Sequence, residues 1–421
     1  MFERNKRVKE IILIVIAIGV TIAGLLFVRS KMKKEEPKKN NETENKDYPP
    51  VELSGNYNID IIREFHTNAG NKNYLLSPYN IEIALNMLRD GSDGETKAQM
   101  DKVLGNRTIN NIEVANKIGI ANGVFIKNEY KNRVKDSYYN ILKTKYNSDI
   151  IYDEYKTPDK INNWVKDKTW NMIDKVIDEV SPDFIMGLAS ALAIDVKWVT
   201  EFDCSITRSE EFTKIDNSKM NTEMMHDTYK SPNYQYIKTK DVEGIILPYR
   251  KEVDSSVQLE FVGLLPTNGI DNYISGLTNE KLEEVFSNTK AGGSNFHIHL
   301  SLPRFTYDYE EKELGKVLSN MGIKDAFVPG VANFKNMIDE NVYVSQAIHK
   351  THIELNEAGT KAAAVTFFGV DGTAIMPEDY EEVSVKFNKP FIYMIREKNT
   401  GEILFFGTVY EPNEWKGSTC K

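Results

Sequence analysis

The chain has 421 residues, with 53 Lys and Arg against 62 Asp and Glu, and a formal net charge of -9. Its 41% apolar and 27% charged residues are ordinary for a globular protein and exclude a collagen-like, disulfide-rich or wholly disordered chain. The acidic balance argues against nucleic-acid binding, and the only cysteines, Cys204 and Cys420, form neither a thiolate zinc site nor a C-x-x-C pair.

The first fifty residues differ in kind from the rest. They hold 11 Lys and Arg against 7 Asp and Glu, whereas the remaining 371 residues hold 42 against 55. After a short basic stretch at 1–10, residues 11–28 are uncharged and apolar, and as a helix they would span about 27 Å, close to a bilayer core. Residues 29–50 are rich in Lys, Glu and Asn and have no apolar periodicity.

This pattern predicts a transmembrane signal anchor at 11–28, a flexible charged stalk at 29–50 and one folded domain at 51–421. A cleaved secretory signal is the alternative, but no small-x-small cleavage site follows the apolar run. We therefore expect a single-pass protein of the cell membrane with an extracellular domain, or a secreted protein if the segment is cleaved.

The first half of the folded part reads as mainly helical. Ser77-Pro78 is a typical helix start, apolar residues follow at helical spacing from Ile81 to Leu88, and Gly91 and Gly94 follow as helix-ending residues. A second amphipathic helix is predicted over residues 161–173.

The second half is predicted to form mostly β-strands, because it contains short runs that are apolar or that alternate between apolar and polar residues. They fall at residues 244–247, 259–265, 296–300, 344–355, 383–387, 391–395 and 403–409. Asn399-Thr400-Gly401 lies between the last two and predicts a hairpin turn.

Standard catalytic signatures are missing from the sequence. It has no P-loop, no G-x-G-x-x-G, no G-x-S-x-G and no H-E-x-x-H. His297 and His299 share one strand face and could share a metal, but no third ligand is indicated, and Cys204 has no motif of a nucleophile beside it. We predict a protein that is not an enzyme and has no catalytic residue, metal or cofactor.

One family resemblance carries the functional prediction. Val344–Lys350, continuing to Asn356–Ala364, closely resembles the serpin signature, in which a strand leads into the reactive-centre loop. Further stretches match the family in the same order, so that the resemblance covers nearly all of residues 55–413; they are Asn73–Met87, Asn162-x-Trp164-Val165, Lys197-Trp198, Leu302–Phe305, Met321–Phe327, Phe387–Phe391 and Leu404–Pro412.

The resemblance implies an α+β serpin-like fold, with helices around a large central mixed β-sheet, smaller sheets and an exposed reactive-centre loop. It implies a monomeric suicide inhibitor that forms a covalent acyl complex with a target serine protease while its loop inserts into the central sheet. The Lys-, Asn- and Ile-rich usage and the anchor suggest a bacterial surface protein. A non-inhibitory serpin, acting as a binding protein or chaperone, is the alternative.

Three groups of residues take roles from the resemblance. The loop hinge corresponds to Glu357, Gly359, Thr360, Ala362, Ala363 and Ala364; the shutter that gates the sheet to Ser77, Asn80, Ser190 and His349; and the breach, where insertion begins, to Trp198, Arg304 and Glu357. An Arg304–Glu357 ion pair is expected. Val196 stands at a position where serpins usually have a glycine.

The loop meets a physical requirement of insertion, since alternate side chains of an inserted strand face the core. Thr360, Ala362, Ala364, Thr366 and Phe368 have the same parity and are uncharged, and the one charge, Lys361, has the opposite parity. A charge facing inward would cost several kcal/mol.

Counting from Glu357 by the family's usual spacing places the scissile bond at Thr373–Ala374, with Ala374–Ile375 and Ile375–Met376 as alternatives; counting backward moves it toward 376–379. A small residue there suits elastase-like or subtilisin-like proteases. Trypsin-like targets are disfavoured because no Lys or Arg lies between Lys361 and Lys386.

Overall fold

A computed structural model describes residues 52–107, 109–110, 112, 114, 117–148, 150–360, 380–413 and 415. The chain divides into Met1–Pro49 and Pro50–Lys421, and all described residues belong to the second unit. The predicted basic N-terminus, anchor and stalk and the loop segment 361–379 lie outside the described residues.

The predicted membrane localisation is corrected by the structure. Within the described ranges, no helix combines the length and the apolar character that crossing a bilayer requires. This finding overturns the expectation of a single-pass membrane protein. The apolar run at 11–28, on which that expectation rested, lies outside the described part of the chain.

Helices are concentrated in the N-terminal half of the described unit. They are α2 (Tyr57–Ala69), α3 (Pro78–Gly91), α4 (Gly94–Leu104), α5 (Asp136–Tyr146), α6 (Asp159–Lys168), α7 (Ile270–Ser275), α8 (Asn279–Ser287) and α9 (Leu314–Asn320), with short 3₁₀ helices η1 (Asn128–Arg133), η2 (Cys204–Ile206) and η3 (Asp325–Phe327).

The central sheet is seven-stranded and mixed. Its strands, in spatial order, are β3 (Ile150–Asp153), β2 (Ile118–Lys127), β4 (Met186–Ile194), β14 (Val344–Asn356), β15 (Gly359–Thr360) and β5 (Val196–Lys197), and β13 (Phe305–Glu311) also pairs with β14. The β2–β3 and β4–β14 pairs are parallel, and the other pairs are antiparallel.

Two further sheets complete the described fold. A seven-stranded antiparallel sheet has the order β1 (Tyr74–Leu76), β18 (Ile403–Val409), β17 (Phe391–Glu397), β10 (Leu259–Pro266), β9 (Val242–Pro248), β8 (Gln235–Lys238) and β11 (Thr289–Ala291). A four-stranded sheet has the order β16 (Glu381–Lys386), β12 (Phe296–Pro303), β7 (Lys219–Tyr229) and β6 (Arg208–Thr213).

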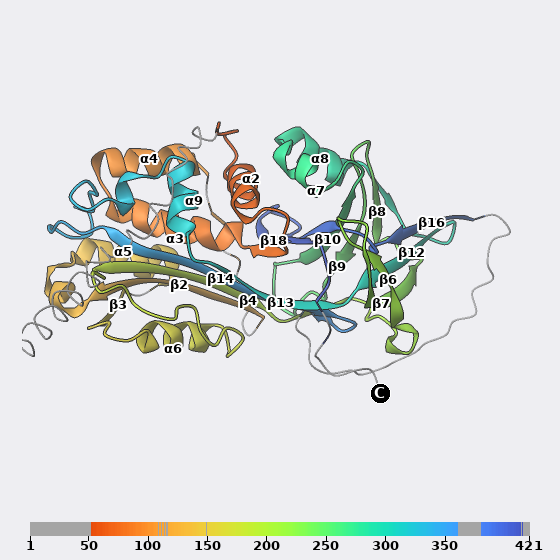
Figure 1. Cartoon of the computed structure of the whole chain (residues 1–421), viewed down its shortest axis with the longest axis horizontal. Helices are drawn as coiled ribbons and strands as arrows, with labels where there is room; N and C mark the ends of the chain where they lie inside the picture. The colour runs from red at the N-terminus through yellow and green to blue at the C-terminus, as the bar shows by residue number, and fades with distance from the viewer. Residues whose placement is uncertain are drawn as a thin grey trace, which may run out of the picture. The chain divides into compact units, whose positions relative to one another are not determined.

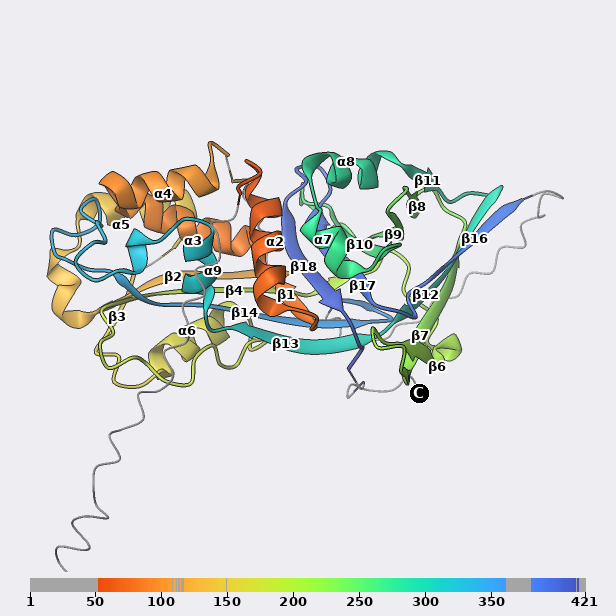
Figure 2. The same ribbon diagram turned by 45° about the horizontal axis from the view of Figure 1, so that its top comes forward.

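Helices cover both faces of the central sheet. In both views α3, α4 and α9 lie on one face and α6 lies on the opposite face (Figures 1 and 2). Helix α3 is buried at almost every position and contacts β2, β4 and β18, so it packs between two sheets, and its polar residues Asn80, Glu82 and Asn86 are buried with the apolar ones. The predicted α+β architecture with a large mixed sheet is confirmed.

Most of the helix starts and turns predicted from clear sequence patterns are confirmed. Helix α3 begins after Ser77, whose side chain accepts from the Asn80 N–H, with Pro78 in the first turn. The predicted hairpin joins β17 to β18, with Gly401 at φ 75°. The segment predicted as a helix over 161–173 ends earlier, because Trp170 and Asn171 adopt positive φ.

The helical interpretation of the first half is only partly right. Strands β2 and β4 both lie there, and they form the middle of the central sheet. Strand β4 is buried at all nine positions, so it shows no alternation that would mark it as a strand.

Candidate functional site

The pairing of β14 with its neighbours changes partway along the strand. From Val344 to Thr351, β14 pairs in parallel with β4. At its other end, Leu355 and Asn356 pair instead with Thr360 and Gly359 of β15, and β15 pairs on its far side with β5. The chain therefore turns after Asn356 and re-enters the central sheet as the two-residue strand β15.

The two residues of β15 are held tightly. Thr360 is 1% exposed, and its hydroxyl lies 2.6 Å from the Tyr249 hydroxyl. Gly359 has φ 155°, and a Cβ placed on it would lie 2.1 Å from the Val196 carbonyl oxygen. Only glycine permits this close approach between backbones. Val196, which replaces a usual family glycine, is the Cα partner of Thr360.

The turn that precedes β15 is bonded to the segment after β5. The Trp198 indole N–H donates to the Asn356 carbonyl oxygen at 2.9 Å, and the Trp198 backbone N–H donates to the Ala358 carbonyl at 3.0 Å. The Phe202 N–H donates to the Glu357 carbonyl at 2.9 Å. The predicted breach residue Trp198 thus contacts the predicted hinge directly.

The expected ion pair between Arg304 and Glu357 is present. The Arg304 Nη1 lies 3.3 Å from the Glu357 Oε1, and the two side chains are only 3% and 9% exposed. The same Glu357 oxygen accepts from the Thr207 hydroxyl at 2.7 Å, and the Arg304 Nη2 lies 3.4 Å from the Glu223 Oε2. Removing one partner of a buried ion pair leaves the other charge uncompensated, which is costly.

Two residues of this site were not predicted from the sequence. Tyr249 stacks on Trp198 with ring centroids 4.5 Å apart, and its hydroxyl contacts Thr360. Thr207 bonds Glu357. Neither residue lies in a motif, and only the fold brings them to the hinge. Arg304 also lies 5.0 Å from the centroid of the Trp415 ring.

The predicted shutter residues are brought together beneath the centre of the sheet. The Ser77 N–H donates to the His349 Nε2 at 3.0 Å, and the Asn80 N–H donates to the Ser77 hydroxyl at 3.3 Å. His349 and Ser190 are Cα partners across the parallel β4–β14 pair. The cluster therefore lies at the pairing of these two strands.

The shutter is buried and incompletely hydrogen-bonded. Burial lowers the pKa of His349 to about 3, which keeps the imidazole neutral at physiological pH. Both amide atoms of the Asn80 side chain and the Ser190 hydroxyl have no hydrogen-bond partner among the described residues. Buried polar atoms without partners are costly, so the closed sheet is held at an energetic cost here.

The other predicted residues of the hinge and the scissile bond lie outside the part of the chain that the structure describes. They are the hinge residues Ala362, Ala363 and Ala364 and the scissile pair Thr373 and Ala374.

The residues weighed as metal ligands or a nucleophile have other contacts. His297 packs on Tyr380 and His299 bonds Glu382, and the described residues contain no group of three metal-ligating side chains. Cys204 is disulfide-bonded and so carries no free thiol.

Comparison with known proteins identifies relatives along almost the whole described unit. A family model described as serpin (serine protease inhibitor) matches residues 52–412. An uncharacterized serpin-like protein of Methanosarcina acetivorans is 30% identical over 373 residues, which are 82% of this chain and 83% of that protein. The leukocyte elastase inhibitor of Xenopus tropicalis is 28% identical over 385 residues, covering 85% and 97% of the two chains.

A solved structure agrees with these matches. The crystal structure of tengpin, a thermophilic serpin, in its native state superposes with a TM-score of 0.74 at 30% identity. The match covers 85% of this chain and 93% of tengpin.

Proposed function

The chain belongs to the serpin family, whose model is that of serine protease inhibitors, and from this premise we propose that it is itself a suicide inhibitor of serine proteases. A protease would cleave the segment 361–379, and the part before the cut would enter the central sheet between β4 and β14. This mechanism needs a hinge, a sheet that can open and a strand whose side chains fit the opening.

The observation that carries the proposal is the position of β15. Because the chain turns back after Asn356, a strand that continues β15 between the parallel strands β4 and β14 runs antiparallel to both of them. Residues Gly359 and Thr360 already do so, against β14 on one side and β5 on the other. Extending this strand would replace one parallel ladder with two antiparallel ladders, which adds backbone hydrogen bonds and thus drives insertion.

The register of β15 fixes which residues would face each other after insertion. Continuing the pairs Leu355–Thr360 and Asn356–Gly359 places Ala362 opposite Ile353, Ala364 opposite Thr351, Thr366 opposite His349 and Phe368 opposite Ala347. All of these β14 residues are buried, at 8% exposure or less. The uncharged loop positions would therefore enter the core, and Thr366 would reach the shutter.

Loop residues with odd numbers, such as Lys361, would point to the other, more exposed face of the sheet. Lys361 would lie opposite Glu354, which is only partly buried. A Lys–Glu cross-strand pair is favourable, whereas like charges are not. The sequence of the loop and the burial pattern of β14 thus agree at Lys361 and at the uncharged positions from Ala362 to Phe368.

The same register supports the proposed scissile bond. Strand β14 has 13 residues, and its first residue, Val344, would pair with Asp371. Thr373 would then emerge just beyond the end of the sheet, after about 43 Å of inserted strand. Attack by the protease serine would break the Thr373–Ala374 amide, form an ester to Thr373 and release the Ala374 amine. The ester would carry the protease along the sheet.

The target class follows from the loop composition. Thr373 is small, and the alternatives Ala374–Ile375 and Ile375–Met376 are also uncharged. We therefore propose proteases with elastase-like or subtilisin-like specificity. The similarity to a leukocyte elastase inhibitor is consistent with this class.

A non-inhibitory serpin, acting as a binding protein or chaperone, is the second candidate. The same fold would then present a loop that is cleaved without trapping the protease. The burial of Thr360 in the sheet and the uncharged parity of the loop favour the inhibitor, since a protein that never inserts its loop has no need of either.

The test is incubation of the full chain with pancreatic elastase, subtilisin and trypsin. We expect a complex that survives denaturing gel electrophoresis with at least one of the first two enzymes and not with trypsin. Mass spectrometry of the released C-terminal peptide should give Ala374 as its first residue. Rapid cleavage by both enzymes without any stable complex would reject the inhibitor and favour the second candidate.

A further inference from the structure

The short segment that contains η2 holds the hinge from one side. The Phe202 N–H donates to the Glu357 carbonyl at 2.9 Å, and the Thr207 hydroxyl donates to the Glu357 Oε1 at 2.7 Å. Between these two residues lies η2, which begins at Cys204. The Thr207 N–H donates to the Cys204 carbonyl at 3.3 Å, so Cys204 is directly bonded to a residue that binds the start of the hinge.

The chain after β18 approaches the hinge from another side. The Asn413 Nδ2 donates to the carbonyl of Thr306, the second residue of β13, at 3.0 Å. Two positions further on, the Trp415 ring centroid lies 5.0 Å from the Arg304 guanidinium carbon. Arg304 is the cation of the buried ion pair with Glu357. Trp415 therefore packs on the ion pair that holds the first hinge residue.

A disulfide at Cys204 gives these two approaches a covalent connection. Cys204 is disulfide-bonded, and the sequence contains one other cysteine, Cys420, five positions after Trp415. Only the two side chains of the ion pair lie between Trp415 and Thr207. Five residues of extended chain span up to about 17 Å, which is long enough to pass over these two side chains.

We propose that a disulfide between Cys204 and Cys420 fastens the chain after β18 across the Arg304–Glu357 pair, as a redox-sensitive latch on the hinge. The cross-link lowers the conformational entropy that is lost when Trp415 is held against Arg304. The contacts that reach Glu357 from both sides are then tied to each other. This regulation rests on the proposed function, because the latch acts on the segment that would insert.

Reduction by a dithiol opens the latch. One thiolate of the reagent attacks a sulfur of the disulfide, which forms a mixed disulfide and releases the other cysteine. The second thiol of the reagent then displaces the remaining cysteine and closes a cyclic disulfide. The reagent loses two electrons and two protons, and both cysteines become thiols. Trp415 then keeps only noncovalent contacts, and the hinge leaves the sheet more often.

The test has two measurements on the full chain. Peptide mass spectrometry without reduction should give one cross-linked peptide that contains Cys204 and Cys420. Hydrogen exchange is then compared between the oxidised chain and the chain reduced with dithiothreitol. The reporters are the Trp198 and Phe202 N–H groups, which donate to hinge carbonyls. Their exchange should rise about tenfold on reduction, which is the size expected for losing one desolvated cation–π contact.

Three variants separate the covalent bond from the packing. Cys420→Ser leaves η2 unaltered and should exchange at the reduced rate with and without dithiothreitol. Trp415→Ala should raise exchange at the same reporters while the disulfide is intact, because it removes the ring from Arg304. Ser418→Ala is the matched control, two positions from the cysteine, and should exchange as the unaltered chain does.

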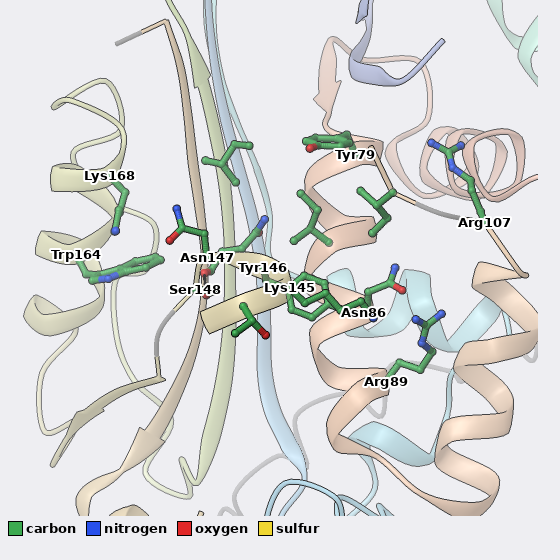
Figure 3. Close-up of a pocket in the computed structure, with 15 residues that line it drawn as sticks. Tyr79, Asn86, Arg89, Arg107, Lys145, Tyr146, Asn147, Ser148, Trp164 and Lys168 are labelled. Carbon is green, nitrogen blue, oxygen red and sulfur yellow. Dashed lines mark hydrogen bonds between the residues drawn. The ribbon is translucent and has the colours of Figure 1, made fainter. Parts of the chain in front are cut away.

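Helix α5 provides an internal control. In both views it lies at the opposite end of the described unit from β6 and β7 (Figures 1 and 2). Figure 3 shows Lys145 and Tyr146, the last two residues of this helix, in close-up. Exchange in α5 should be the same in the oxidised and reduced chains.

Several results would overturn the latch. They are a disulfide-linked dimer, two free thiols, equal exchange at the reporters before and after reduction, an unchanged rate in Trp415→Ala, or an equal rise in α5. No protease is present in these measurements. Their outcome is therefore distinguishable from a failure to inhibit proteases, which would reject the proposed function and not the latch.

Discussion

Two neighbouring alanines of the loop allow a sharp test of insertion. In the extended register, Ala364 would lie opposite Thr351, which is fully buried, whereas Ala363 would lie opposite His352 on the partly exposed face. We predict that Ala364→Arg converts the inhibitor into a substrate and that Ala363→Arg does not. The two variants carry the same substitution at adjacent positions and differ only in parity.

The magnitude follows from burying an uncompensated charge. An unpaired buried arginine costs about 3–5 kcal/mol. If that cost falls on the insertion step, insertion slows by about two to four orders of magnitude, while hydrolysis of the acyl ester is unaffected. Nearly every Ala364→Arg molecule would then be cleaved and released, and the number of inhibitor molecules consumed per protease would rise accordingly.

The assay is titration of a fixed amount of elastase or subtilisin with each variant, followed by measurement of residual protease activity and denaturing gel electrophoresis. The unaltered chain and Ala363→Arg should both give stable complexes. Equal loss of inhibition in the two variants, or full inhibition by Ala364→Arg, would refute the register and the reasoning from it.

Three further predictions concern the described site. Gly359→Ala should expel β15, because its Cβ would lie 2.1 Å from the Val196 oxygen; hydrogen exchange at Thr360 should rise at least about tenfold, and an unchanged rate would contradict this. Arg304→Met should destabilise the protein by about 3–5 kcal/mol through the unpaired Glu357, and adding Glu357→Gln should recover part of the loss in urea unfolding; no recovery would argue against the pair. Because the folded pKa of His349 lies below the unfolded value, the unfolded state binds more protons between about pH 3 and 6.5. The free energy of unfolding therefore decreases as the pH is lowered. Between pH 7 and pH 5 the unaltered chain should lose about 2 kcal/mol more of this free energy, measured by urea unfolding, than the His349→Gln variant. An equal pH dependence of the two proteins would refute this.

The sequence supplied much of the fold where local patterns are strong. The Ser77 cap and Pro78 predicted the start of α3, and apolar runs predicted β9, β10, β12 and the C-terminal strands. Strand β4 was missed because it is buried on both faces and contains Gly187 and several alanines. Only its neighbours in the sheet make this segment a strand.

The site was predicted in its residues and in one contact, the Arg304–Glu357 ion pair, but not in the rest of its geometry. The resemblance identified Trp198, Arg304 and Glu357, and the structure brings these three together. No sequence pattern indicated that β15 pairs within the sheet, because that pairing depends on contacts between residues more than a hundred positions apart.

The central claim is that cleavage of the loop leads to its insertion between β4 and β14. The most direct test is the melting temperature of the full chain before and after complete cleavage at the loop by a non-target protease. About ten added backbone hydrogen bonds at about 1 kcal/mol each should raise it by about 10–20 °C. A cleaved chain that melts at the same temperature as the intact one would contradict the claim.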